Sequence, residues 1–237
     1  MQIVADEGVK IVFTSAGSPK KWTGWLHERG ITVVHVVSSS RFAVKAEEAG
    51  VDAIVAEGFE AGGHNGREET TTLCLIPAVR TVTTLPLIAA GGIATGEAML
   101  AARVLGAEGV QIGTRFALTA ESSANEVFKD YCLHLEEGDT RLLLKKLAPV
   151  RLVRNNFRSA VEAAEAVGAS EEELRILLGR GRAKRGIFEG DLEEGELEIG
   201  QVSVLLHGKG VQSVASVMQE LVEESRRAWE RMQELDF

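Results

Sequence analysis

The chain has 237 residues, of which 45% are hydrophobic and 26% charged, and this composition is that of an ordinary globular protein. Its 26 basic and 35 acidic side chains give a formal net charge of −9, so a general nucleic-acid partner is not expected. No apolar run is long enough to span a bilayer, and two cysteines are too few for a disulfide scaffold. With acidic residues at the amino terminus where a secretory signal would be basic, these features predict a cytoplasmic enzyme that acts on a small molecule.

The first half of the chain repeats a unit in which an apolar strand is followed by a polar turn, an amphipathic helix and a glycine. Ser18, Ser40 and Thr95 stand where helix N-caps are expected, and Gly30, Gly50 and Gly106 stand where left-handed C-caps are expected. Nearly continuous apolar strands are typical of a parallel sheet that is buried on both faces. The predicted strands cover 10–17, 31–39, 51–58, 85–92 and 109–116.

The pattern changes after residue 118. Residues 119–180 have helical spacing without a further strand signal, 181–210 are rich in glycine and irregular, and 211–235 predict a terminal amphipathic helix. We therefore predict two parts, a partial (β/α) barrel over 1–118 and a helical appendage with a C-terminal loop and helix over 119–237.

Five predicted strands leave two architectures open. One is an open, doubly wound five-stranded sheet. The other is a (β/α)₈ barrel that lacks its first three strand–helix units, or about 90 residues at the usual size of such barrels. An incomplete barrel has exposed strand edges, which favour pairing with another chain and hence a homo-oligomer.

Two neighbouring strand ends carry a pattern suited to anion binding. The segment IAAGGIATGEAM (88–99) ends a buried strand in Gly91-Gly92 and begins a helix near Thr95. The next strand ends in QIGT (111–114), where Gly113 and Thr114 add amide and hydroxyl donors. Glycines allow close backbone approach and helix N-termini attract anions, so the pair predicts a phosphate site.

A long insert after the third predicted strand, EGFEAGGHNG (57–66), places His64 among glycines at the ligand-facing end of the sheet. A histidine there can exchange a proton near neutral pH, and Glu57 could accept a hydrogen bond from a ligand. His35 is expected in the core or at the barrel mouth. No metal-binding spacing is present, so no metal site is predicted. The basic side chains of the second half are expected on solvated helix faces: Arg141, Lys145, Lys146, Arg151, Arg154, Arg158, Arg180, Arg182, Lys184 and Arg185.

Three segments, IVAEGFEAGGHNG, LPLIAAGGIATGEAMLAARVLGAEGVQIGTRF and EGDLEEGELEIGQVS, together resemble the nitronate monooxygenase (2-nitropropane dioxygenase) family, which includes the FMN-dependent enoyl-ACP reductases. The resemblance implies a (β/α)₈ barrel that holds FMN at its C-terminal mouth. It also implies that His64 is the active-site histidine and that Gln201 belongs to a loop that returns to the pocket. The implied FMN-binding residues are Glu57, Ala61, Gly62, Gly91, Gly92, Gln111, Gly113 and Thr114.

The glycine-rich first strand and the asparagine-bearing third strand typical of the family are not found in this sequence. Three functions stay open on the sequence alone. The first is FMN-dependent oxidation of alkyl nitronates or nitroalkanes by O₂, and the second is NAD(P)H-dependent reduction of an enoyl thioester on an acyl carrier. The third is a non-catalytic fragment that binds phosphate.

Overall fold

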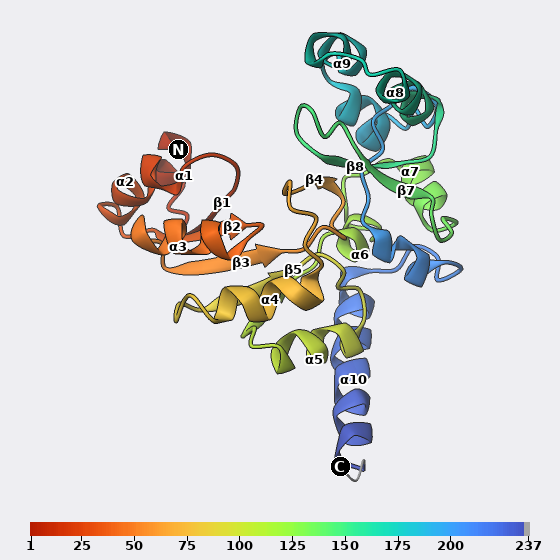
Figure 1. Cartoon of the computed structure of the whole chain (residues 1–237). Coiled ribbons are helices and arrows are strands. Elements are labelled where there is room, and N and C mark those ends of the chain that lie inside the picture. The colour runs from red at the N-terminus through yellow and green to blue at the C-terminus, as the bar shows by residue number, and fades with distance from the viewer. Residues whose placement is uncertain (235–237) are drawn as a thin grey trace.

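The computed structural model describes residues 1–234, and its centre is a five-stranded parallel sheet (Figure 1). Each strand lies beside the one that precedes it, in the order β1-β2-β3-β5-β6. Consecutive strands side by side, without a reversal of order, form an arc of a (β/α)₈ barrel and exclude the doubly wound alternative, in which the strand order reverses. The strands are β1 (Ile11–Thr14), β2 (Thr32–Val37), β3 (Ala53–Glu57), β5 (Leu87–Ala90) and β6 (Gly109–Gln111).

The inner strands β2, β3 and β5 are largely buried on both faces, as their apolar sequences predict, whereas in β1 at the edge of the sheet Ile11 and Phe13 are exposed. In β3, Ile54 and Ala56 pack into the main apolar cluster with Leu26, Ile76 and Leu87, while Val55 points to the other face. This second face belongs to a smaller cluster with residues of β2 and β5 and corresponds to the inside of the arc. The crossover helices are α2 (Thr23–His27), α3 (Ser40–Glu48), α4 (Thr72–Arg80) and α5 (Gly96–Val104), and the short helices α1 (Gln2–Asp6) and η1 (Pro19–Lys21) flank β1.

The predicted glycine caps are confirmed, because Gly30, Gly50 and Gly106 all have positive φ at the ends of their helices. Thr95 also caps α5 as expected, with its hydroxyl accepting the amide of Ala98. The prediction for α3 was off by one residue, since Ser39 rather than Ser40 is its N-cap. The N-cap is defined by its backbone conformation, and three consecutive serines give no sequence signal for which of them adopts it.

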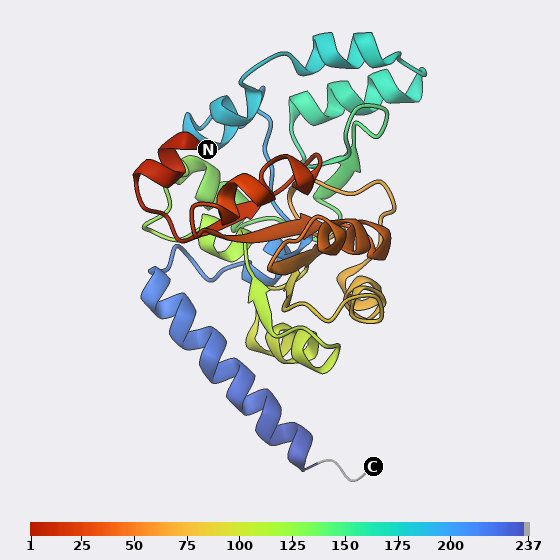
Figure 2. The same ribbon diagram turned by 90° about the vertical axis from the view of Figure 1, so that its left-hand side faces the viewer.

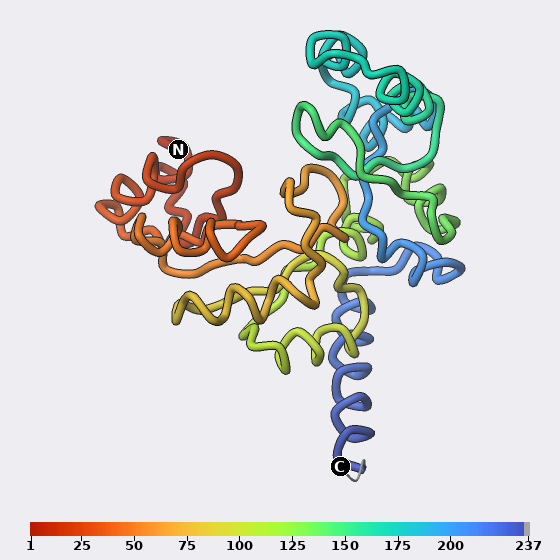
Figure 3. Tube along the Cα trace, viewed as in Figure 1, coloured from red at the N-terminus to blue at the C-terminus, as the bar shows by residue number. Residues whose placement is uncertain are grey.

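A second, antiparallel sheet of three strands, in the order β4-β8-β7, joins the barrel arc to the second half of the chain. β4 (Gly63–His64) comes from the insert after β3, and in Figure 3 the trace of this insert rises from the central sheet toward the second half. The expectation that 119–180 holds no strand was wrong, because β7 (Thr140–Leu143) and β8 (Val150–Val153) lie there. Leu143, Val150 and Leu152 of these strands are buried in a cluster with Phe157 and Leu174, so tertiary packing outweighs the helical spacing.

The rest of the second half is helical or irregular, and it ends in the long helix α10 (Val214–Gln233). This helix packs along α5 and runs away from the sheet (Figure 2). Residue 235 of the predicted terminal helix lies outside the described residues. Within 1–234, no helix combines the length and apolar character that crossing a membrane requires. The other elements are α6 (Thr114–Ala117), α7 (Glu126–Cys132), α8 (Asn156–Ala166), α9 (Glu171–Leu178), the π-helix η2 (Lys184–Phe188) and the 3₁₀ helix η3 (Gln201–Leu206).

Candidate functional site

A cavity of about 220 Å³, here called the glycine cavity, lies at the carboxyl ends of β3, β5 and β6. All parallel strands present their carboxyl ends at one edge, where ligands of such folds bind. The structure therefore brings together residues as far apart in the sequence as Glu57 and Val202. Its lining includes every one of the eight residues predicted to bind FMN: Glu57, Ala61, Gly62, Gly91, Gly92, Gln111, Gly113 and Thr114.

The glycines of this cavity are needed for different physical reasons. Gly91 has a φ of +81°, and a Cβ atom there would lie 2.5 Å from the carbonyl oxygen of Gly58. At Gly62 a Cβ would lie 2.5 Å from the backbone of Ile199. Gly113, in contrast, faces open space, with nothing within 4 Å of an added Cβ. Two glycines thus permit close chain packing, while the third leaves room beside the first turn of α6.

Thr114 is tied to the late segment of the chain that returns to the site. The amide of Gly200 donates to its hydroxyl oxygen at 3.0 Å, which leaves the hydroxyl proton free to be donated to an anion. The amide of Gln201 donates to the carbonyl oxygen of Glu60 at 2.9 Å. The predicted return of this segment is thus seen in the backbone, whereas the Gln201 side chain is exposed and does not line the glycine cavity.

The amides at the start of α5 are not free for a ligand, contrary to expectation. The amide of Gly96 donates to the Glu224 carboxylate at 2.9 Å, and that of Ala98 donates to the Thr95 hydroxyl. Glu224 comes from α10, more than a hundred residues later, so no local sequence signal announces it. An anion in the glycine cavity would therefore rely on the backbone at Gly91-Gly92 and on the residues around Gly113 and Thr114.

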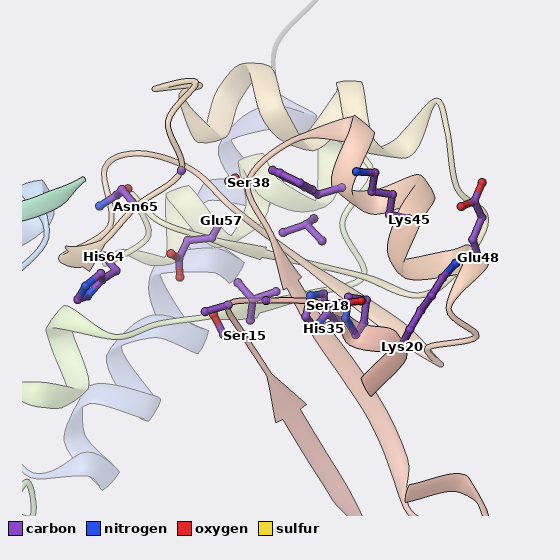
Figure 4. Close-up of a pocket in the computed structure, with 17 residues that line it drawn as sticks. Ser15, Ser18, Lys20, His35, Ser38, Lys45, Glu48, Glu57, His64 and Asn65 are labelled. Atoms are coloured by element: carbon purple, nitrogen blue, oxygen red, sulfur yellow. The ribbon is translucent and has the colours of Figure 1, made fainter. Parts of the chain in front are cut away.

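A larger cavity of about 740 Å³, here called the histidine cavity, lies at the ends of β1, β2 and β3. His64 lines it at one end and Lys20 and Lys45 at the other, with Glu57 between them (Figure 4). The His64 side chain is exposed, as a group that meets a substrate must be. Both lysines are exposed, and within residues 1–234 neither forms an ion pair.

His35 also lines the histidine cavity, although only 6% of its surface is exposed. Its Nδ1 forms a hydrogen bond of 2.7 Å with the hydroxyl of Thr14, which fixes the ring. Burial lowers its pKa, so the ring is neutral at physiological pH. This placement confirms the expected position at the barrel mouth.

Glu57 is the one residue that lines both cavities. Burial raises the pKa of its carboxyl group to about 7, so near neutral pH it can either donate or accept a hydrogen bond. Two other carboxylates of the glycine cavity were not predicted. Glu60 accepts hydrogen bonds of 3.0 Å from the amide and the hydroxyl of Thr72 and thereby caps α4. Glu198 lies against Gly63, and burial raises its pKa as well.

Arg151 holds the loop that carries His64, and its predicted place on a solvated helix face was wrong. It lies on β8, only 1% of its surface is exposed, and its guanidinium lies over the Phe59 ring. It donates to the carbonyl oxygens of Phe59 at 2.5 Å and Ala61 at 3.1 Å. The sequence did contain a weak signal, because PVRLV is a short apolar run interrupted by one arginine, and short apolar runs are consistent with a buried strand.

The donor set suits the phosphate end of a flavin nucleotide. The glycine cavity offers a backbone that a side chain would obstruct at Gly91, an open position at Gly113 and a hydroxyl proton at Thr114. Such groups bind phosphate without a metal ion or a basic side chain. In the part of the chain that the structure describes, no group of three or more His, Cys, Asp or Glu side chains is arranged to hold a metal.

Comparison with known proteins places the chain among proteins of one enzyme family. The family model described as "Nitronate monooxygenase" matches residues 1–224. A probable nitronate monooxygenase of Staphylococcus haemolyticus is 42% identical over 119 residues, which are 46% of this chain and 33% of that protein. Another from Staphylococcus saprophyticus is 35% identical over 170 residues, covering 66% of this chain and 47% of that protein. These matches thus span about a third to a half of the length of the curated relatives.

Two solved structures are similar over 98% of this chain. FabK from Thermotoga maritima has a TM-score of 0.88 and 36% identity, and 73% of that chain is covered. Nitroalkane oxidase from Streptomyces ansochromogenes has a TM-score of 0.78 and 26% identity, with 68% of that chain covered. Because the family model matches nearly the whole chain, this protein belongs to the nitronate monooxygenase family.

Proposed function

We propose that the protein is an FMN-dependent oxidoreductase that oxidises alkyl nitronates and nitroalkanes with O₂. The observation that carries this proposal is the position of Glu57, which joins the glycine cavity to the histidine cavity. A flavin with its phosphate in the first cavity would extend past Glu57 toward the second, which His64 lines. The flavin, when bound, supplies the redox chemistry.

The residues of the chain have separate tasks in this proposal. The backbone at Gly91 and Gly92, with Gly113 and Thr114, binds the phosphate. His64 takes a proton from the carbon next to the nitro group of a neutral nitroalkane, which turns it into the oxidisable nitronate. The exposed imidazole of His64 has room for this approach, and the contacts of Arg151 hold the loop that carries it.

The proposal is tested by the absorbance spectrum of the purified protein and by O₂ uptake. We expect the bands of oxidised flavin, and O₂ consumption with ethylnitronate in the absence of NADH. For His64→Ala we expect FMN to stay bound and turnover of neutral nitroethane to fall about 100-fold, while preformed nitronate is oxidised as before. The matched control is His134→Ala, since that histidine is also exposed but lies on neither cavity. Unchanged nitroethane turnover in His64→Ala would remove the proton-transfer role.

The similarity to FabK over 98% of the chain favours a second candidate, a reductase of enoyl thioesters that uses NAD(P)H. An acidic carrier protein would need basic residues near the mouth, and Lys20 and Lys45 lie there. Oxidation of NADH that depends on an enoyl-CoA would identify this activity. A colourless protein that cannot be reconstituted with FMN would leave only the third alternative, a non-catalytic fragment.

A further inference from the structure

Arg115 follows Thr114 directly and is almost completely buried, with 2% of its surface exposed. Its Nη1 donates to the carbonyl oxygen of Ala94 at 2.6 Å. Ala94 lies two residues after Gly92, in the loop that follows β5, whereas Arg115 itself lies in α6, after β6. One guanidinium group therefore connects the two loops that form the proposed phosphate cradle, Gly91-Gly92 and Gly113-Thr114.

The same guanidinium is held from the other side by the C-terminal helix α10. Its Nη2 forms an ion pair with Glu220, and its Nη1 lies 3.6 Å from a carboxylate oxygen of Glu224. Glu224 also accepts the amide of Gly96, the first residue of α5. Lys209 adds a contact of 3.1 Å to Glu220. The side chains of α10 thus fix both the arginine and the start of the helix that follows the Gly91-Gly92 loop.

We expect this network to act on the cradle by fixing the positions of its two loops, and not by attracting the phosphate electrostatically. The charge of Arg115 is matched by two carboxylates, and a guanidinium presents its donors in a rigid planar fork. A phosphate bound by backbone amides from two loops requires both loops to keep their separation, because hydrogen bonds weaken steeply with distance and angle. In the proposed binding mode, only the phosphate of the cofactor would depend on that separation, because the cradle would hold no other part of it.

We propose that Arg115 is a positioning residue of the phosphate cradle and that α10, through Glu220 and Glu224, is part of the cofactor site. This inference rests on the proposed binding of FMN. It predicts that loss of the network weakens binding of the phosphate group selectively, and leaves binding of the isoalloxazine and ribityl groups nearly unchanged.

The experiment compares the affinities for FMN and for riboflavin, which lacks the phosphate, by quenching of flavin fluorescence on the protein freed of its flavin. The variants are Arg115→Lys and the milder Glu224→Gln, and the matched control is Glu223→Gln, a neighbouring exposed glutamate on the same helix. We expect wild type and control to bind FMN more tightly than riboflavin. In Arg115→Lys and Glu224→Gln, affinity for FMN should fall about tenfold, with riboflavin affinity within about twofold of wild type.

Three outcomes would overturn the inference, and they can be told apart. If the variants keep the wild-type preference for FMN, Arg115 does not position the cradle, although the cradle itself stands. If both affinities fall equally, the network has only a general structural role. If wild type shows no preference for FMN over riboflavin, the proposed phosphate site fails and the inference fails with it.

Discussion

The two cavities at the mouth of the barrel arc are built in opposite ways. The glycine cavity is small, and its lining includes Gly62 and Gly91, at which an added Cβ would lie 2.5 Å from the backbone of another segment. The histidine cavity is more than three times larger and is lined by side chains from several elements, including Lys20 of η1, Lys45 of α3 and His64 of β4. Glu57 is their shared wall. Under the proposed function, the cofactor phosphate would occupy the first cavity and the substrate would occupy the second.

The difference also explains why the first cavity could be read from the sequence. Some positions need a positive φ or a close approach by another segment of the same chain. Few residues other than glycine can occupy such positions, so they are recognisable in the sequence as glycine motifs. Side chains that merely line a wide cavity satisfy no such constraint. Lys45 of α3, for example, lines the histidine cavity, but nothing in the sequence distinguishes it from a lysine on a solvent-exposed helix face.

Among the substitutions that test this difference between the cavities, we expect Gly91→Ala to lower the free energy of unfolding most. Alanine at a φ of +81° is strained, and its Cβ would lie 2.5 Å from the carbonyl oxygen of Gly58, so we expect unfolding free energy to fall by about 4 kcal/mol. Chemical denaturation measures this directly. The matched variant is Gly113→Ala, whose Cβ meets nothing within 4 Å and should change stability by less than about 1 kcal/mol. Equal effects of the two substitutions would show that the backbone of the glycine cavity is not packed as described.

A second, somewhat smaller effect is expected for Arg151→Leu. Loss of the guanidinium leaves the carbonyl oxygens of Phe59 and Ala61 buried without their charged donor, at a cost of about 3 kcal/mol. Arg154→Leu, three residues later and 70% exposed, should change the free energy of unfolding by less than about 0.5 kcal/mol. Thermal and urea denaturation of both variants measure the difference. A stable Arg151→Leu protein would contradict the role of this residue in holding the His64 loop.

The smallest expected effect is on the pH dependence of stability, and it comes from Glu57, which lies between the two cavities. The pKa of Glu57 is raised from 4.5 to about 7 in the folded protein, so its contribution to stability is complete below pH 4.5 and is lost as pH rises through 7. Glutamine does not ionise, so Glu57→Gln removes this loss. We expect the difference in unfolding free energy between the variant and wild type to shift in favour of the variant by about 2 kcal/mol from pH 5 to pH 8.

Denaturation at the two pH values measures this change. Glu196, whose pKa is also raised to about 7, and Glu198 continue to titrate in the variant, so part of the pH dependence persists. A Glu57→Gln protein with the full wild-type pH dependence would show that the Glu57 carboxyl is well solvated.

Much of the barrel arc was predictable because its signals are local. The five apolar strands, the glycines at 30, 50 and 106 and the N-cap at Thr95 each depend on a few adjacent residues. The strands β7 and β8 were missed because their burial depends on Phe157 and Leu174, which only folding brings to them. Arg151 was misplaced for the same reason, since its partners are the backbone carbonyls of a loop about 90 residues earlier.

For the site, the sequence by itself determined which strand ends carry the glycines that line the glycine cavity. Only the tertiary structure decided that Glu57 lies between two cavities. It also decided that Glu224 accepts a hydrogen bond from the amide at the start of α5, and that Arg115 connects the two loops of the cradle. The physical reason is that conformational restrictions act within one residue and its neighbours, whereas hydrogen bonds and burial depend on groups that are distant in sequence and meet only in the folded chain.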